Sequence, residues 1–328
     1  MKNPCYLPLL DVYRSGYIDN RFYALAYLYD KNGLVCDFGS KAYESLFGST
    51  LTDFSVKFYL RSLFKPIQAS ILGDEIIDKF GFSESELAVM QGSHTGEPLH
   101  AELVQSILNK IGLNEEALLC PLIEPLNTKI YGRDVKFSRL HNNCSGKHSM
   151  MLAYSRAYNL DISNYTDYNH PVQIKIREKL LNYAQTDDYI STSDGCTVPV
   201  YGLKMPDIAR AFLNYYSDSK NFRLIKSYKN NPYVIGGADN SGKRTDTKIS
   251  ELSLNLVSKV GAGGFIYVYN FKTNQILIVK MAQNNNEVRE ILTLELLYRL
   301  KWLDERFYDS KIYTEAGDAI GEYVFNLN

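Results

Sequence analysis

Residues 61–66 read Arg61-Ser62-Leu63-Phe64-Lys65-Pro66, which places a serine and a lysine three positions apart where an apolar helix could begin. Positions i and i+3 share one face of a helix, so the Lys65 amine could reach the Ser62 hydroxyl. A serine hydroxyl is a weak nucleophile at neutral pH, and a lysine whose pKa is lowered by burial or nearby cations can serve as its base. Pro66 favours the first turn of a helix over its middle. The pattern predicts a serine nucleophile, with an exposed helical turn as the structural alternative.

The composition of the chain limits its partners. Its 328 residues include 36 Lys and Arg against 37 Asp and Glu, a net charge of -1. No overall field steers such a protein toward nucleic acid or an anionic membrane, so a small neutral or zwitterionic ligand is favoured. No stretch is apolar enough to span a membrane, and prolines interrupt the first apolar run too early for a signal peptide, so we expect a cytoplasmic protein. Five cysteines without a scaffold spacing favour reduced thiols or metal ligands over disulfides.

Strand signals gather at the two ends of the chain and helical signals in its middle. Asn32-Gly33 between two aromatic and apolar runs predicts a hairpin, and the runs at 265–269 and 276–280 predict another. We therefore expect an α/β fold in one domain, with an antiparallel sheet from residues 1–60 and 255–328 and a mostly helical lobe from residues 61–254. Helices are expected at 67–80, 83–90, 98–111, after 144, and at 206–216, 246–257 and 287–303, with loops at 40–57 and 228–244.

The S-x-x-K motif and the expected arrangement of strands and helices both suggest one known architecture. S-x-x-K is the acylation motif of serine β-lactamases and penicillin-binding proteins. In those proteins a sheet formed from both ends of the chain carries an inserted helical lobe, and by analogy Ser62 and Lys259 would line one cleft.

The loop Gly92 to His100 crowds polar groups in front of a helix. It contains a second serine candidate, Ser93, and two histidines, His94 and His100. Either histidine could act as an acid or base, but a single histidine is more often a hydrogen-bonded structural residue.

Two cysteines lie on polar, glycine-bearing turns. Asn143 or Cys144 stands at a predicted helix N-terminus, where the helix dipole and free amide groups lower the pKa of a thiol. Cys196 follows Asp194-Gly195. Because zinc prefers thiolate and imidazole ligands, the residue chemistry pairs these cysteines with His148, and two free buried thiols are the alternative.

Six blocks of this sequence, in this order, resemble one family, the Rhizobium etli-type L-asparaginases, also called asparaginase II or class 3. The resemblance covers roughly residues 11–303. The blocks are Arg61-Ser62-Leu63-Phe64-Lys65-Pro66-Ile67-Gln68, Gly92-Ser93-His94-Thr95-Gly96-Glu97, Asn143-Cys144-Ser145-Gly146-Lys147-His148, His170-Pro171-Val172-Gln173, Asp194-Gly195-Cys196-Thr197-Val198-Pro199 and Lys259-Val260-Gly261-Ala262.

The resemblance implies a serine β-lactamase-like fold, a homodimer, and hydrolysis of the side-chain amide of L-asparagine to L-aspartate and ammonia. It pairs Ser62, as nucleophile, with Lys65, and Ser93 with Lys259. It also implies a zinc site formed by Cys144, Lys147 and Cys196. In this ligand set His148 does not bind the metal and lies beside it or against the substrate. This differs from the expectation from residue chemistry alone, in which His148 is a zinc ligand. Further substrate contacts are expected from Arg61, His94 and Asp194.

Some positions depart from the family pattern. Thr95 stands where serine is usual, Thr197 where glycine is usual, Ser149-Met150 where two small residues are usual, and Gly263 where glutamate is common. These changes leave two alternatives to the hypothesis that the protein is an asparaginase. One is a hydrolase of another small amide or of a β-lactam-like acyl donor. The other is a zinc-dependent amino-acid-binding protein with weakened catalysis.

Overall fold

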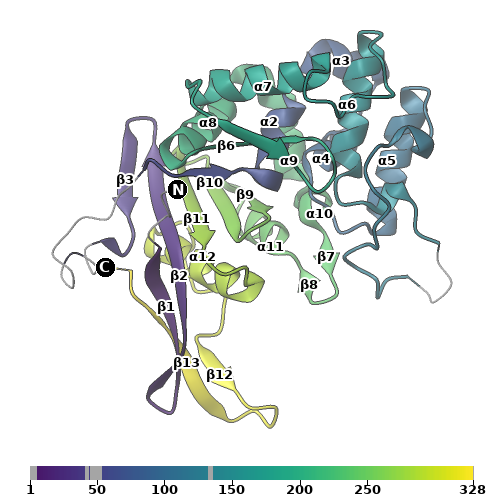
Figure 1. Ribbon diagram of the computed structural model, residues 1–328. Coiled ribbons are helices and arrows are strands. Elements are labelled where there is room, and N and C mark those ends of the chain that lie inside the picture. The colour runs from purple at the N-terminus through teal and green to yellow at the C-terminus, as the bar shows by residue number, and fades with distance from the viewer. Residues whose placement is uncertain (1–5, 41–43, 45–53, 132–135, 328) are drawn as a thin grey trace. The chain divides into compact units, whose positions relative to one another are not determined.

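The computed structural model describes residues 6–40, 44, 54–131 and 136–327. The chain divides into two compact units (Figure 1). The sheet unit comprises residues 1–56 and 258–328, and the helical unit comprises residues 57–257. The helical unit is therefore an insertion in the sequence of the sheet unit. Most of the segment 40–57, expected to form a loop, lies outside the described residues.

An eight-stranded sheet forms the sheet unit within the described residues. Its order is β12-β13-β1-β2-β11-β10-β9, and β3 pairs with β2. The pairs β1–β13, β1–β2, β2–β11 and β10–β11 are antiparallel. The sheet thus joins both ends of the chain, and the predicted fold class is confirmed. The strands are β1 (Leu7–Arg14), β2 (Tyr17–Asp30), β3 (Gly33–Asp37), β9 (Leu256–Gly261), β10 (Phe265–Asn270), β11 (Gln275–Met281), β12 (Lys311–Tyr313) and β13 (Ala319–Phe325).

The centre of this sheet follows from its residues. All six residues of β10 are buried, and most are aromatic or β-branched, which suits a strand covered on both faces. Helix α12 (Asn286–Arg299) contacts β11. Both predicted hairpins are confirmed: Asn32 lies in the turn between β2 and β3, where its N–H donates to Asp30 Oδ1 at 2.7 Å, and a polar turn joins β10 to β11.

Helices make up most of the helical unit, with α4 in contact with α5, α6, α9 and α10. A three-stranded sheet of order β4-β6-β5 and a two-stranded pair, β7 and β8, complete it. The α-helices are α2 (Lys65–Ala69), α3 (Gly73–Phe80), α4 (Glu84–Gln91), α5 (Pro98–Lys110), α6 (Ser145–Ala157), α7 (Pro171–Ala184), α8 (Met205–Ser217), α9 (Phe222–Asn230), α10 (Pro232–Gly236) and α11 (Thr245–Leu252). The short 3-10 helices are η1 (Arg61–Phe64), η2 (Glu115–Ala117), η3 (Arg139–His141) and η4 (Ser219–Asn221). The strands are β4 (Lys57–Tyr59), β5 (Ile190–Ser193), β6 (Pro199–Lys204), β7 (Ala238–Asp239) and β8 (Gly242–Lys243).

Residues typical of helix ends are found where several of these helices begin or end. Ser83 and Glu86 form a capping box at the start of α4, within the helix predicted at 83–90. Cys144, one of the two residues predicted for this helix end, is the N-cap of α6. Gly112 follows α5 with a φ of +70°, in the left-handed region that glycine adopts without strain.

Three expectations were wrong. The helix expected at 67–80 is divided into α2 and α3, because Gly73 has a φ of +61° and interrupts the helical backbone. The loop expected at 228–244 contains the end of α9, all of α10, and the β7–β8 pair. The helix expected to reach Val257 ends at Leu252, because residues from Leu256 onward join the sheet as β9.

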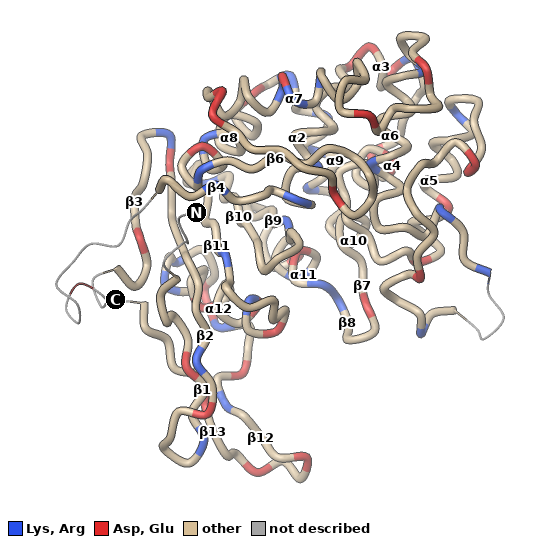
Figure 2. Tube along the Cα trace, in the orientation of Figure 1, with Lys and Arg blue, Asp and Glu red and all other residues tan. Residues whose placement is uncertain are grey.

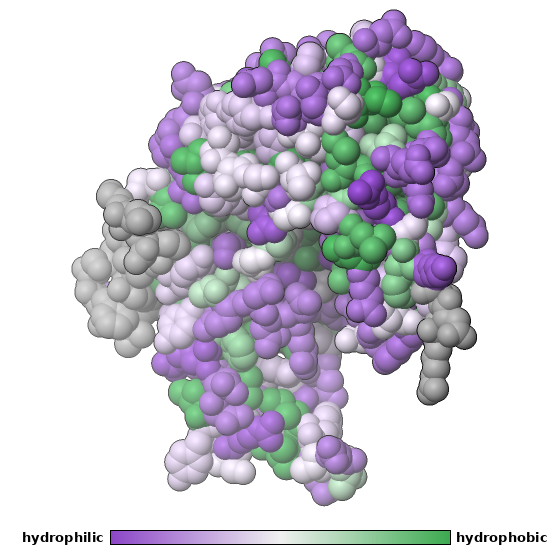
Figure 3. Space-filling view, turned by 45° about the vertical axis from the view of Figure 1, so that its right-hand side comes forward, coloured by the Kyte–Doolittle hydropathy of each residue, from purple (hydrophilic) through white to green (hydrophobic). Residues whose placement is uncertain are grey.

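Charges of both signs are interspersed along each unit, in keeping with the nearly neutral composition (Figure 2). Hydrophilic side chains cover much of the face drawn in Figure 3, with smaller hydrophobic patches among them. In the described part of the chain, no helix combines the length and the apolar character needed to cross a bilayer.

Candidate active site

A chain of hydrogen bonds links Ser62, Ser93 and Lys65 in the helical unit. Ser62 lies in η1, Lys65 is the first residue of α2, and Ser93 follows the C-cap of α4. Ser93 Oγ is 3.0 Å from Ser62 Oγ, and Lys65 Nζ is 3.1 Å from Ser93 Oγ. Ser62 is partly exposed, whereas Ser93 and Lys65 are only 2% and 1% exposed. The hydroxyl that a ligand can reach is thus connected through a buried hydroxyl to a buried amine.

The surroundings of Lys65 favour its neutral form. Burial lowers the pKa of this lysine, and the charge of Lys147 lowers it further, while the thiols of Cys144 and Cys196 act in the opposite direction. Lys65 Nζ also donates to the carbonyl oxygen of Asn143 at 2.8 Å, and this second bond restrains the amine next to Ser93 Oγ. A neutral amine in this position can accept a proton.

Arg61 and Asp194 form an ion pair beside Ser62. Arg61 Nε is 2.5 Å from Asp194 Oδ1, and the Arg61 side chain is 40% exposed. Burial would raise the pKa of Asp194, but the charges of Lys147 and Arg61 lower it on balance. Arg61 has a φ of +47°, which is uncommon for a residue with a side chain and places local strain directly before Ser62.

Two thiols and an amine meet at the start of α6. Cys144 and Lys147 are three positions apart and share one helix face, and Cys196 comes from the turn between β5 and β6. Lys147 Nζ is 2.9 Å from Cys196 Sγ. The hydrogen bond between the two thiols, aided by the charge of Lys147, lowers the pKa of Cys196 to about 5, and the same bond together with burial raises the pKa of Cys144 to about 12. Burial opposes the charged form of Lys147, but the two neighbouring thiols raise its pKa.

This donor set fits a soft divalent cation. Zinc binds thiolate sulfur and nitrogen ligands, and a lysine amine can serve when the cation displaces its proton. Among the described residues, no group of three or more His, Cys, Asp or Glu side chains could hold a metal ion, so a site here would need Lys147 as its third ligand.

His148 lies one residue beyond Lys147 and is buried. Its Nδ1 is 2.7 Å from the Tyr165 hydroxyl. No partner within the described residues is found for its Nε2. Burial, with the charge of Lys147 beside it, lowers the pKa of His148 to about 3, so this imidazole is neutral.

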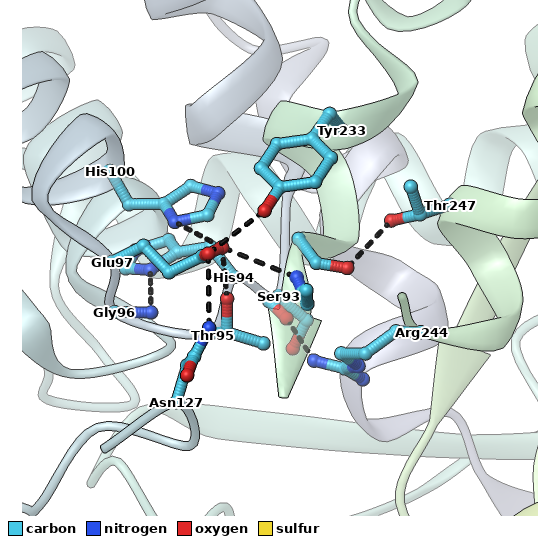
Figure 4. Close-up of polar contacts among 12 residues, drawn as sticks. Ser93, His94, Thr95, Gly96, Glu97, His100, Asn127, Tyr233, Arg244 and Thr247 are labelled. Carbon is cyan, nitrogen blue, oxygen red and sulfur yellow. Dashed lines mark hydrogen bonds and ion pairs between the residues drawn. The ribbon is translucent and has the colours of Figure 1, made fainter. Parts of the chain in front are cut away.

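The loop that carries Ser93 also contains a buried carboxylate, Glu97 (Figure 4). Glu97 Oε1 accepts hydrogen bonds from Asn127 Nδ2 at 3.1 Å and the Tyr233 hydroxyl at 2.8 Å. Glu97 Oε2 accepts hydrogen bonds from Thr95 Oγ1 at 2.8 Å and the Ala238 N–H at 3.2 Å. Glu97 therefore joins its own loop to two distant segments.

Both predicted histidines of this loop are buried and their rings are stacked, with centroids 4.8 Å apart. His94 Nε2 is 3.1 Å from Ser145 Oγ, and its Nδ1 accepts the Gly96 N–H at 3.2 Å. Burial lowers the pKa of His94 well below its usual value and that of His100 to about 4. The two rings are neutral packing partners, and a contact between His94 and substrate stays a prediction.

Lys259 belongs to the sheet unit, on β9, where it is buried and its Nζ donates to the Val260 carbonyl at 3.1 Å. Its predicted pairing with Ser93 of the helical unit stays a prediction. Gly263, where the family commonly has glutamate, lies in the turn between β9 and β10 with a φ of +76°. Glycine suits that backbone conformation.

The order of the hydrogen-bond chain differs from the one predicted from the sequence. The predicted contact was directly between Ser62 and Lys65, whereas in the structure Ser93 connects them. No role was predicted for Glu97 either, although this carboxylate stood inside a quoted block, just before Pro98. Arg244, whose guanidinium donates to the carbonyl oxygen of Ser93, was missed because it lay in a segment taken for a loop.

The comparison with curated proteins gave no match. Among solved structures, a β-lactamase from Mycobacterium bovis is similar, with a TM-score of 0.41 and 12% sequence identity over 84% of this chain and 94% of that one. The sequence profile of the L-asparaginase II family matches residues 10–325. That match spans nearly the whole chain, and the protein belongs to the L-asparaginase II family.

Proposed function

We propose that this protein hydrolyses the side-chain amide of L-asparagine to L-aspartate and ammonia, with Ser62 as the nucleophile. The observation that carries the proposal is the hydrogen-bond chain from the partly exposed Ser62 hydroxyl through Ser93 to the buried Lys65 amine. Membership of the L-asparaginase II family supports the reaction class.

The proposed reaction has two stages. Ser62 Oγ attacks the amide carbon, its proton passes to Ser93, and the Ser93 proton passes to the neutral Lys65 amine. Return of a proton along the same path lets ammonia leave, and an acyl-enzyme remains on Ser62. Water then cleaves this ester with the same groups as base and acid. From the family resemblance, Lys259 is the proposed second amine that serves Ser93.

The charges of an amino acid suit the Arg61–Asp194 pair. L-Asparagine carries an α-carboxylate and an α-ammonium group, and we propose that Arg61 binds the first and Asp194 the second. Arg61 uses Nε for Asp194, and the two terminal nitrogens of its guanidinium are further donors on a side chain that is 40% exposed.

Cys144, Lys147 and Cys196 are the proposed ligands of one zinc ion per chain. A bound cation would supply positive charge beside the ion pair and hold the turn that carries Asp194. His148 would lie next to it, with its Nδ1 held by Tyr165. We also propose that the protein is cytoplasmic and forms a homodimer, and light scattering on the purified protein would test the dimer.

The first test is ammonia release from L-asparagine by the wild-type protein and by Ser62→Ala. We expect the variant to lose several orders of magnitude in rate with an unchanged unfolding midpoint. Ser191→Ala, which removes an exposed hydroxyl on β5, is the matched control and should retain activity. Equal activity of Ser62→Ala and wild type would refute the proposal.

If wild-type protein releases no ammonia from asparagine, its reaction with a β-lactam distinguishes the two alternative functions. A covalent adduct on Ser62, seen by mass spectrometry, would indicate an acyl-transfer hydrolase with another substrate. Asparagine binding by calorimetry, without ammonia release or an adduct, would indicate a binding protein.

A further inference from the structure

A distant segment of the helical unit holds the backbone of Ser93. We call residues 92–97 the Ser93 turn and residues 232–244 the clamp segment. The Ser93 N–H donates to the Ile235 carbonyl at 2.8 Å. Figure 4 shows the second bond, in which Arg244 Nη1 donates to the Ser93 carbonyl. Both backbone polar groups of Ser93 are thus bonded to the clamp segment.

The two segments pack with their backbones in contact. A Cβ added at Gly92 would lie 2.9 Å from the Ile235 carbonyl oxygen, closer than real Cβ atoms approach. A Cβ at Gly237 would lie 2.6 Å from Glu97 Oε2, and Gly237 has a φ of +80°. Glycine is therefore required on both sides of the contact.

Arg244 is itself fixed in place. Its backbone N–H donates to the Gly237 carbonyl at 3.0 Å, which closes the β7–β8 pair. Its Nε lies 3.9 Å from a carboxylate oxygen of the buried Asp246, and its side chain is only 15% exposed. A charge-assisted bond from such a restrained guanidinium to a carbonyl is stronger than a bond between neutral groups.

We propose that Arg244 is a positioning residue for the Ser62–Ser93–Lys65 chain, acting through the backbone carbonyl of Ser93. This inference rests on the proposed function of Ser93 as the proton relay. Ser93 Oγ must stay within hydrogen-bond reach of two groups at once, at 3.0 Å and 3.1 Å. Loss of the Arg244 bond releases the Ser93 peptide to rotate, and a displacement of about 1 Å would break both contacts.

A direct contact between Arg244 and substrate is the competing role, and kinetics separate the two. A positioning residue affects the chemical step, so its removal lowers kcat and leaves KM almost unchanged. Removal of a residue that binds the substrate carboxylate equally in the ground and transition states raises KM instead.

The experiment compares wild type with Arg244→Ala, Arg244→Lys and Arg210→Ala. Arg210 is a matched control, because its Nη1 also donates to a backbone carbonyl, that of Ala184, in the same unit. For Arg244→Ala we expect kcat to fall about 100-fold with KM within about threefold of wild type. Arg244→Lys, which keeps a cationic donor, should recover part of the loss, and Arg210→Ala should behave as wild type.

Added guanidinium provides a further readout. The space left in Arg244→Ala can admit the ion, so a non-denaturing concentration of guanidinium chloride should raise kcat of this variant and not that of Arg210→Ala. An unchanged kcat in Arg244→Ala, or a rise in KM without a fall in kcat, would overturn the proposal. So would a failure of both lysine and guanidinium to restore any activity.

A crystal structure of Arg244→Ala, or of Arg244→Lys should the alanine variant not fold, tests the same inference without any activity. We expect the distance between Ser93 Oγ and Ser62 Oγ to exceed 3.5 Å in the alanine variant and to be shorter in the lysine variant. An unchanged distance in the alanine variant would overturn the positioning role even if the protein proved inactive on asparagine. Failure of the proposed function and failure of this inference are thus distinguishable.

Discussion

Lys65 Nζ and Ser93 Oγ lie 3.1 Å apart, although 28 positions separate the two residues in the sequence. This contact places Ser93 between the buried amine and Ser62. The hydroxyl of Ser93 is therefore the path by which the lysine can act on the proposed nucleophile, and the proposed chemistry depends on the alignment of three side chains from two separate segments.

The lowered pKa of Lys65 predicts how stability depends on pH. The pKa of this amine lies below its usual 10.5 in the folded protein, because burial disfavours the charged form. Below 10.5 the unfolded chain binds a proton more readily than the folded one, so this contribution to stability is complete above 10.5 and is lost as pH falls toward the folded pKa. Lys65→Met should therefore show a smaller increase in unfolding free energy between about pH 7 and about pH 10. Urea unfolding of both proteins across this range measures the difference, and equal slopes would contradict the prediction.

Glu97→Gln should destabilise the protein by about 1–3 kcal/mol, the cost of leaving buried polar groups unsatisfied. Each carboxylate oxygen of Glu97 accepts two donors, and the amide of glutamine can replace only one oxygen as an acceptor. Urea unfolding measures the loss. The control is Glu102→Gln, an exposed position on α5, which should change stability by less than about 0.5 kcal/mol.

Thr197→Gly should stabilise the protein by about 1 kcal/mol. Thr197 has a φ of +76°, and a β-branched side chain is strained in that region. The family usually has glycine here, so the substitution restores a residue that suits the backbone. Thr192→Gly, within the extended strand β5, is the comparison and should lose stability by a similar amount. Thermal unfolding of the two variants gives the signs, and a loss of stability in Thr197→Gly would show that other contacts of the threonine outweigh its strain.

Zinc content should depend on the cysteines at the start of α6 and in the β5–β6 turn. We expect about one zinc per chain in purified protein, by elemental analysis, and its loss in Cys196→Ser, because removal of one of three protein ligands weakens binding strongly. Cys36→Ser, on β3 of the sheet unit, should keep the metal. Zinc retained in Cys196→Ser would contradict the proposed ligand set.

The features that the sequence predicted well depend on neighbouring residues. Asn32-Gly33 turns a hairpin, and Ser83 with Glu86 starts a helix, because the partners are a few positions apart. The clamp segment was predicted to be a loop because proline and glycine are common in loops. In the structure Pro232 is the first residue of α10 and Gly237 follows its last residue.

Distant contacts could not be predicted in the same way. Arg244 and Ser93 are 151 positions apart, and no local pattern marks an arginine that donates to a backbone carbonyl. The resemblance to a family supplied the candidate residues of the site. It did not supply the order in which Ser62, Ser93 and Lys65 are connected.

The pairing of β1 with β13 has a consequence for the synthesis of the protein. Asp11 lies opposite Val324, so β1 finds one of its two neighbours only after β13 has left the ribosome. The helical unit, residues 57–257, is synthesised earlier and can fold while the sheet still lacks strands. A premature stop codon late in the gene would therefore leave the first strand with an unpaired edge, and such edges promote aggregation.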